Sequence, residues 1–261
     1  MLLVVAVVLG LPLWMVVLTA SKSVGEAQSP NLNLPTTWRL WDNIVTAISD
    51  ARFFSGLFGT VLLSVPTVLI VLFIGSMASW ILARRTTRLT ATLYALAISG
   101  IILPPAVVTV VLLVRQLGLS GTALGMVGVY VGIYMSTVIF FVTGFIRGLP
   151  PELEEAARID GAGPVTVFLR IVLPLLRPVL ATATILITLF VWTDVFYAFF
   201  VVGGRLDTLT LNLFSIASSG QYILNFNLIF AYIILMSLPL LLVFVFAQRQ
   251  IISGVTSGAV K

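Results

Sequence analysis

The sequence contains no cysteine and no histidine, and charged residues make up only 9% of its 261 positions. Without these side chains the chain has no disulfides, no thiolate or imidazole ligands for a metal ion, and no histidine-based catalytic triad. It also lacks the G-x-x-x-x-G-K-[ST] loop that holds nucleotide phosphates, so we do not expect it to hydrolyse ATP by itself. These absences indicate a chain that is not itself an enzyme.

Hydrophobic residues make up 60% of the chain, and its mean hydropathy is +1.18. A soluble globular domain carries about 25% charged residues, so this composition is that of a membrane protein. The net charge of +5 does not indicate a nucleic-acid partner, because most of the arginines are scattered between apolar segments and form no basic stripe. We expect one transmembrane domain, residues 1–261, in contact with lipid.

Six apolar stretches approach or exceed the length of about 20 residues that a membrane-spanning helix requires. Only helices and closed barrels satisfy their own backbone hydrogen bonds in lipid. We therefore predict an all-α polytopic fold with spans at 2–20, 57–83, 89–113, 123–146, 179–202 and 224–246. The alternative for the first stretch is a secretory signal peptide, but it lacks a basic leader and a clear cleavage site, which favours a membrane helix.

The basic residues indicate the orientation, because cytoplasmic loops of membrane proteins carry an excess of lysine and arginine. Nine of the fourteen basic residues fall in the loops after spans two and four and at the C-terminus. The tight cluster Arg84-Arg85-x-x-Arg88 is the clearest part of this bias. We predict that both termini and the loop at about 147–177 face the cytoplasm.

The segment at about 21–55 is then the main external loop. We expect a short interfacial helix around Trp38–Ala51, because tryptophans concentrate at the level of the lipid headgroups.

A polar segment interrupts the apolar sequence between the fourth and fifth predicted spans. After two prolines, three acids fall in a first helical turn, where the helix dipole favours negative charge: Glu152, Glu154 and Glu155. Gly161 suits the left-handed end of a helix, and Pro164 opens a second helix with apolar residues at helical spacing. The pattern predicts helix, glycine turn and amphipathic helix, a docking element of fixed shape; the alternative is an ordinary interfacial loop.

One acid, Asp194, lies within the fifth apolar stretch, where a carboxylate is costly unless it faces water or a partner. Carboxylate oxygens accept hydrogen bonds from hydroxyl groups, and aromatic rings pack on C–H faces. We predict that Trp192, Thr193, Asp194 and Tyr197 line the pathway of a neutral, polyhydroxylated substrate; the alternative is a structural hydrogen bond. Pro104-Pro105 in the third span is either a tolerated kink or a break lining such a pathway.

The polar segment is similar to a known signature. Glu155-Ala156-Ala157, Gly161, Ile171 and Leu173-Pro174 match the EAA signature of bacterial ABC-importer permeases. The sequence at 149–163 resembles the carbohydrate branch, as in the second permease of maltose-type systems. The resemblance implies a six-helix, type I importer permease fold. It also implies a non-catalytic permease subunit of an ATP-driven, binding-protein-dependent sugar importer, with alternating access driven through the EAA loop.

The same resemblance implies the partners: a homologous second permease, two ATP-binding subunits that hold ATP and Mg²⁺, an external solute-binding protein, and a sugar. This chain itself is expected to hold no cofactor and no metal ion, and to lie in the bacterial cytoplasmic (inner) membrane. The residues assigned to ATPase coupling are Glu154, Glu155, Ala156, Ala157, Asp160, Gly161, Ile171, Leu173 and Pro174. The tail at 248–261 is expected to make a secondary contact with the ATPase pair.

Three other interpretations stay open. An ABC permease for a polyamine or glycerol phosphate would need complementary charge in its cavity, and only Asp194 is evident. An ion-coupled secondary transporter predicts relay acids or internal repeats, and neither is apparent. A structural membrane scaffold leaves the docking segment unexplained.

Overall fold

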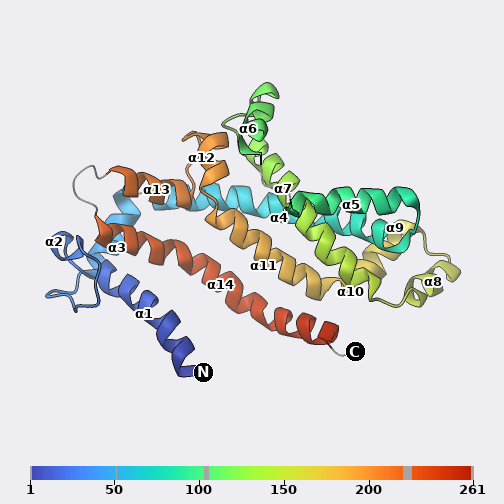
Figure 1. Ribbon diagram of the computed structural model, residues 1–261, viewed down its shortest axis with the longest axis horizontal. Coiled ribbons are helices and arrows are strands. Elements are labelled where there is room, and N and C mark those ends of the chain that lie inside the picture. The colour runs from blue at the N-terminus through green and yellow to red at the C-terminus, as the bar shows by residue number, and fades with distance from the viewer. Residues whose placement is uncertain (1, 51, 103–105, 220–224, 260–261) are drawn as a thin grey trace. The chain divides into compact units, whose positions relative to one another are not determined.

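The computed structural model describes residues 2–50, 52–102, 106–219 and 225–259, and within these ranges every regular element is a helix (Figure 1). The all-α prediction is therefore confirmed for the described part of the chain. Its helices are α1 (Leu2–Ala20), α2 (Val24–Ala27), α3 (Leu40–Asp50), α4 (Phe53–Arg84), α5 (Arg88–Ile102), α6 (Val107–Gln116), α7 (Ala123–Arg147), α8 (Glu152–Ile159), α9 (Pro164–Val167), the π-helix η1 (Phe168–Val172), α10 (Leu173–Leu175), α11 (Arg177–Thr193), α12 (Phe196–Val202), α13 (Leu209–Ser219) and α14 (Phe226–Ala259). Pro104 and Pro105 lie outside the described residues.

The described residues contain fewer candidate membrane spans than the six that the sequence predicts. In the described part of the chain, α4, α7 and the Phe226–Val245 portion of α14 are long and apolar enough to cross a membrane. Two bent pairs, α5 with α6 and Pro164–Leu175 with α11, raise the count to five at most. Hydropathy alone does not detect a break within an apolar stretch, so the predicted fifth span appears as α11 and α12. The six-span count is not confirmed.

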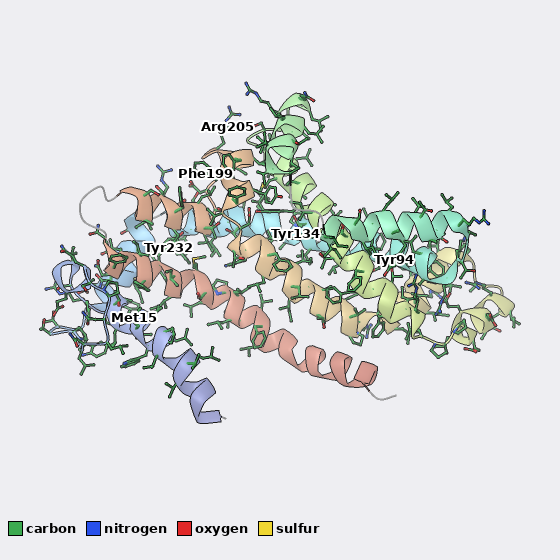
Figure 2. The ribbon with its side chains drawn as sticks, in the orientation of Figure 1. Met15, Tyr94, Tyr134, Phe199, Arg205 and Tyr232 are labelled. Atoms are coloured by element: carbon green, nitrogen blue, oxygen red, sulfur yellow. The ribbon has the colours of Figure 1, made fainter. Side chains whose placement is uncertain are left out.

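The chain divides into two compact units, and the first consists of residues 1–61 and 192–242. Its buried core joins side chains from α3, α4, α13 and α14 to Trp192 at the end of α11. The ring of Tyr232, labelled in Figure 2, meets that of Phe53 edge to face, with their centroids 5.8 Å apart. Such aromatic pairs add to the energy of apolar packing, so this core holds the ends of these helices in one arrangement.

A buried amide connects three helices of this unit. Asn43 of α3 donates hydrogen bonds to the carbonyl oxygens of Ala20 and Lys22, and its Oδ1 accepts one from Asn227 of α14. Asn43 is buried, and a buried polar group is costly unless it is hydrogen-bonded. The amide therefore fixes the end of α1 against α3 and α14. The predicted interfacial helix is α3, which begins at Leu40.

The segment before α3 is held by one carboxylate. Glu26 accepts hydrogen bonds from the backbone N–H and the hydroxyl group of both Ser23 and Thr36. These donors favour the charged form and lower the pKa of Glu26 to about 2, the Thr36 hydroxyl having the largest effect.

The second unit consists of residues 62–191 and 243–261. Within it α4 and α7 approach closely, because a Cβ atom at Gly75 would stand 2.7 Å from Cγ1 of Val138. Tyr134 of α7 stacks on Phe190 of α11 with ring centroids 5.6 Å apart, and the Arg147 guanidinium lies 4.7 Å from the ring centroid of Tyr94 in α5. Figure 2 labels Tyr134 and Tyr94. These contacts tie α4, α5 and α11 to α7.

Candidate functional site

The predicted docking segment has the shape that its sequence indicates. Pro151 immediately precedes α8, three acids occupy its first turn, and the helix ends at Ile159. Gly161 has a φ of +84°, in the left-handed region that favours glycine, and Pro164 starts α9. The helix–glycine–helix prediction is confirmed.

One side of α8 faces outward and carries three exposed apolar residues. Ile159 is 86% exposed, Leu153 is 46% exposed, and Ala156 is exposed. These three residues recur every third position, so they lie on the same side of the helix; we call them the docking face. An exposed apolar surface of this kind marks a site of protein contact or lipid contact.

The structure separates the nine residues that the sequence assigns to ATPase coupling. Four of them are exposed, in α8 or in the turn after it, two of α8 are buried, and three in η1 and α10 are half-buried. The exposed ones are Glu155, Ala156, Asp160 and Gly161; the buried ones are Glu154 and Ala157; the half-buried ones are Ile171, Leu173 and Pro174.

Glu154 points inward, away from the docking face, and is only 4% exposed. Its Oε1 accepts a hydrogen bond of 2.8 Å from Nε of Arg84, and its Oε2 accepts one of 2.8 Å from Nε1 of Trp80. Nη2 of Arg158, one turn further along α8, lies 3.2 Å from Oε2. We call these four residues the Glu154 cluster. The sequence marked Glu154 as polar and helical but gave no sign that it is enclosed.

The second half of the segment is anchored by Phe168. Its ring is 3% exposed and lies 5.7 Å from the ring of Trp80 and 6.2 Å from that of Phe73, both in α4. Phe168 begins η1, which ends directly before Leu173-Pro174, where proline removes a backbone donor. Beyond it the chain bends by 74° into α11.

The residues predicted to line a substrate pathway have different environments. Trp192 is buried and donates from Nε1 to the carbonyl oxygen of Met236, 3.0 Å away. Tyr197 is also buried, whereas Thr193 is exposed. The Asp194 carboxylate accepts hydrogen bonds from the backbone N–H groups of Tyr197 and Ala198. These two donors at the start of α12 would otherwise have no partner within the helix. This cap gives Asp194 a structural role; the pathway role stays a prediction.

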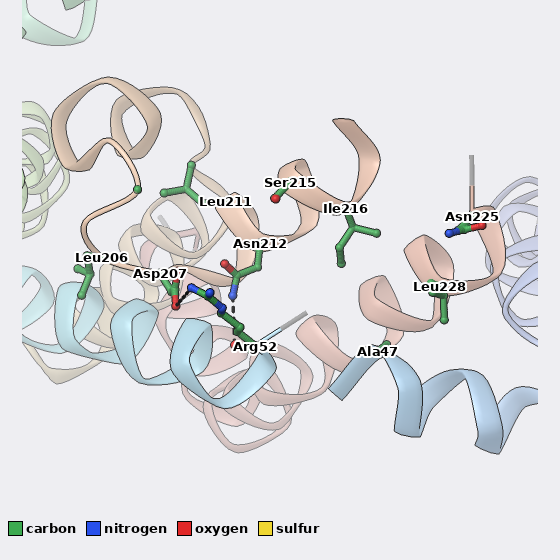
Figure 3. Close-up of a pocket in the computed structure, with 11 residues that line it drawn as sticks. Ala47, Arg52, Leu206, Asp207, Leu211, Asn212, Ser215, Ile216, Asn225 and Leu228 are labelled. Atoms are coloured by element: carbon green, nitrogen blue, oxygen red, sulfur yellow. Dashed lines mark hydrogen bonds and ion pairs between the residues drawn. The ribbon is translucent and has the colours of Figure 1, made fainter. Parts of the chain in front are cut away.

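Sequence reasoning missed a polar cavity of about 560 Å³ in the first unit (Figure 3). Its lining includes Arg52, Asp207 and Asn212. Arg52 and Asp207 form an ion pair with a distance of 3.9 Å between Nη1 and Oδ2. The side-chain amide of Asn212 donates a hydrogen bond of 3.1 Å to the carbonyl oxygen of Arg52. Ser55 donates to the Asp207 carboxylate at 2.7 Å. No short motif joins these residues, because about 150 positions separate the partners along the chain.

Apolar helices of spanning length, with a polar helix–turn–helix segment between α7 and α11, are typical of a multi-pass membrane protein. The chain belongs to the family described as the binding-protein-dependent transport system inner membrane component, whose model matches residues 72–257. The resemblance to ABC-importer permeases is thereby confirmed.

Two curated relatives cover nearly the whole chain. The chain is 33% identical to the melibiose/raffinose/stachyose import permease protein MelC of Bacillus subtilis, over 96% of this chain and 91% of that protein. It is 30% identical to the diacetylchitobiose uptake system permease protein NgcG of Streptomyces coelicolor, over 98% and 85%. Among solved structures, it matches a crystal structure of a bacterial ABC transporter involved in the import of the acidic polysaccharide alginate, with a TM-score of 0.79, 19% identity and 95% of each chain covered. The last likeness shows the fold.

Proposed function

We propose that the chain is the permease subunit of an ATP-driven, binding-protein-dependent importer of a sugar or oligosaccharide. The observation that carries the proposal is the docking face of α8, three exposed apolar side chains on the helix–turn–helix segment of a membrane transport subunit. Docking on an ATPase explains why the chain presents such a surface although it holds no phosphate-binding loop of its own.

The proposed assembly contains this chain, a homologous permease, two ATP-binding subunits and a solute-binding protein outside the membrane. The ATP-binding subunits hold ATP and Mg²⁺. With both termini and residues 147–177 in the cytoplasm, closure of the ATPase pair displaces α8. That displacement switches a midplane site between outward and inward access.

A neutral sugar is the substrate class that we favour. MelC and NgcG, which match almost end to end, are named for the uptake of oligosaccharides. Within the predicted fifth span, Asp194 is the single acid, and Trp192 and Tyr197 stand beside it in sequence. A phosphate ester or a polyamine would require more complementary charge than one carboxylate that caps a helix.

Disrupting the docking face tests the proposal. Ile159→Asp places a charge in the centre of an apolar contact, and we expect at least about a tenfold loss of ATPase subunits that co-purify with the permease. Leu34→Asp is the matched control, because Leu34 is 68% exposed and lies in the segment predicted to be external. Equal retention of the ATPase subunits by both variants and the native chain would show that α8 is not the docking element.

A further inference from the structure

The Glu154 cluster joins two helices through a charge that is removed from water. Both oxygens of Glu154 are occupied, Oε1 by Arg84 of α4 and Oε2 by Trp80 of α4 and Arg158 of α8. The Arg84 side chain is itself only 20% exposed. Hydrogen bonds between charged partners are stronger than neutral ones, and a buried carboxylate that loses its cation is left uncompensated. Helix α8 therefore cannot separate from α4 without a large penalty.

Two more contacts join the docking segment to the last turns of α4. Nη2 of Arg84 donates to the carbonyl oxygen of Leu149, 3.1 Å away, in the chain that leads into α8. Beyond α8, Phe168 packs on Trp80 and Phe73. The last turns of α4 thus hold the docking segment before α8, within α8 and after α8. Contacts at three separate points restrain both translation and rotation of the segment.

We propose that Glu154 is a positioning residue that locks α8 to the Arg84 end of α4, so that any displacement of α8 moves α4 with it as one rigid body. This inference rests on the proposed function. It divides the two adjacent acids by role: Glu155 is exposed beside the docking face, whereas Glu154 transmits the motion into the membrane. Glu154 needs no contact with the ATPase for this role.

Substitutions separate transmission from docking. Glu154→Gln keeps the size of the side chain, but its neutral amide presents an NH₂ group to a cluster that consists of donors. We expect the assembled transporter to retain its ATPase subunits, while the amount of sugar moved per ATP hydrolysed falls about tenfold or more. Glu152→Gln is the matched control, because it removes an exposed acid from the same first turn.

The double variant Glu154→Gln with Arg84→Met distinguishes positioning from stability. Removing both charges relieves the uncompensated partner that either single change leaves, so thermal stability and assembly recover relative to Arg84→Met. If Glu154 only stabilises the fold, the ratio of sugar to ATP recovers with them. If it transmits motion, that ratio stays low.

A distance measurement tests the lock directly. The chain has no cysteine, so spin labels at Arg85→Cys and Glu152→Cys, both exposed, report the end of α4 and the start of α8. In the assembled transporter we expect one narrow distance that is the same without nucleotide and with ATP, and a broadened distribution after Glu154→Gln. A native distance that changes between the two states overturns the proposal.

The remaining outcomes also decide the question. A Glu154→Gln transporter that fails to assemble, or that moves as much sugar per ATP as native, overturns the proposal too. Absence of ATP-dependent sugar uptake by the native assembly contradicts the proposed function instead. Native uptake together with an unaffected Glu154→Gln variant contradicts only the lock.

Discussion

The turn after α8 allows a perturbation whose magnitude follows from backbone geometry alone. Gly161 has a φ of +84°, and within the described residues no heavy atom beyond its chain neighbours lies within 4 Å of the position that a Cβ would take. Gly161→Ala therefore creates no clash with a neighbour, and its cost is the strain of a left-handed residue with a side chain. That strain is about 1–2 kcal/mol.

Because 1.4 kcal/mol corresponds to a factor of ten, the native turn should become about 5- to 30-fold less favoured relative to relaxed conformations. Gly163 supplies the matched control two positions further on. It has a φ of −69° and a ψ of 162°, and its Cβ position is equally open. Gly163→Ala should leave the backbone unstrained, because alanine adopts these angles readily.

Uptake by the reconstituted transporter, at fixed concentrations of ATP and binding protein, is the appropriate assay. Gly161→Ala should reduce uptake several-fold, because the docking face and the second half of the loop lose their fixed relation, whereas Gly163→Ala should match the native rate. Similar uptake by the two variants would refute the argument that the left-handed turn sets the shape of the docking segment.

Two further predictions concern other parts of the chain. The pKa of Glu26 is lowered from 4.5 to about 2, so its contribution to local stability is present above pH 4.5 and is lost as the pH falls from 4.5 to about 2. Hydrogen exchange at the Thr36 amide, corrected for the intrinsic rate, should accelerate as the pH falls from 4.5 to about 2. In Glu26→Gln, protection of this amide should be low and independent of pH. Native protection that does not change with pH would contradict the prediction. Asp194→Asn should keep a cap on α12 and hence the thermal stability of the protein. It should lower sugar transport about tenfold if the carboxylate contacts substrate. Unchanged transport and unchanged substrate-stimulated ATP hydrolysis would show that the role of Asp194 is structural.

Local sequence rules predict local structure well here. The shape of the docking segment follows from prolines and acids at a helix start, Gly161 at a left-handed position and Pro164 at the next start. The short helix α3 was predicted from Trp38 and Trp41, which are also local features of the sequence.

Contacts between distant residues were not predictable from those rules. Arg84 served in the sequence as a marker of orientation, and Glu154 as part of the predicted docking segment, yet 70 positions apart they form one buried ion pair. Helical spacing places Glu154 and Ala157 on the same side of α8, but spacing alone does not show that this side is buried, and only a buried acid requires a cation. Nothing in the sequence identifies which arginine supplies it.

The break between α11 and α12 was missed for a different reason. Hydropathy treats residues 179–202 as one apolar stretch, but Asp194 accepts two backbone N–H groups and so favours the start of a new helix there. An acid within a membrane segment was interpreted as a substrate contact, although its side chain also has a local backbone role.

Transport in a defined system tests the central claim most directly. The chain is reconstituted into lipid vesicles with its homologous permease, the two ATP-binding subunits and the binding protein, and uptake of labelled oligosaccharide is measured. We predict uptake that requires both ATP and the binding protein and that is abolished by Ile159→Asp in α8. Uptake driven by an ion gradient without ATP, or undiminished by Ile159→Asp, would contradict the account.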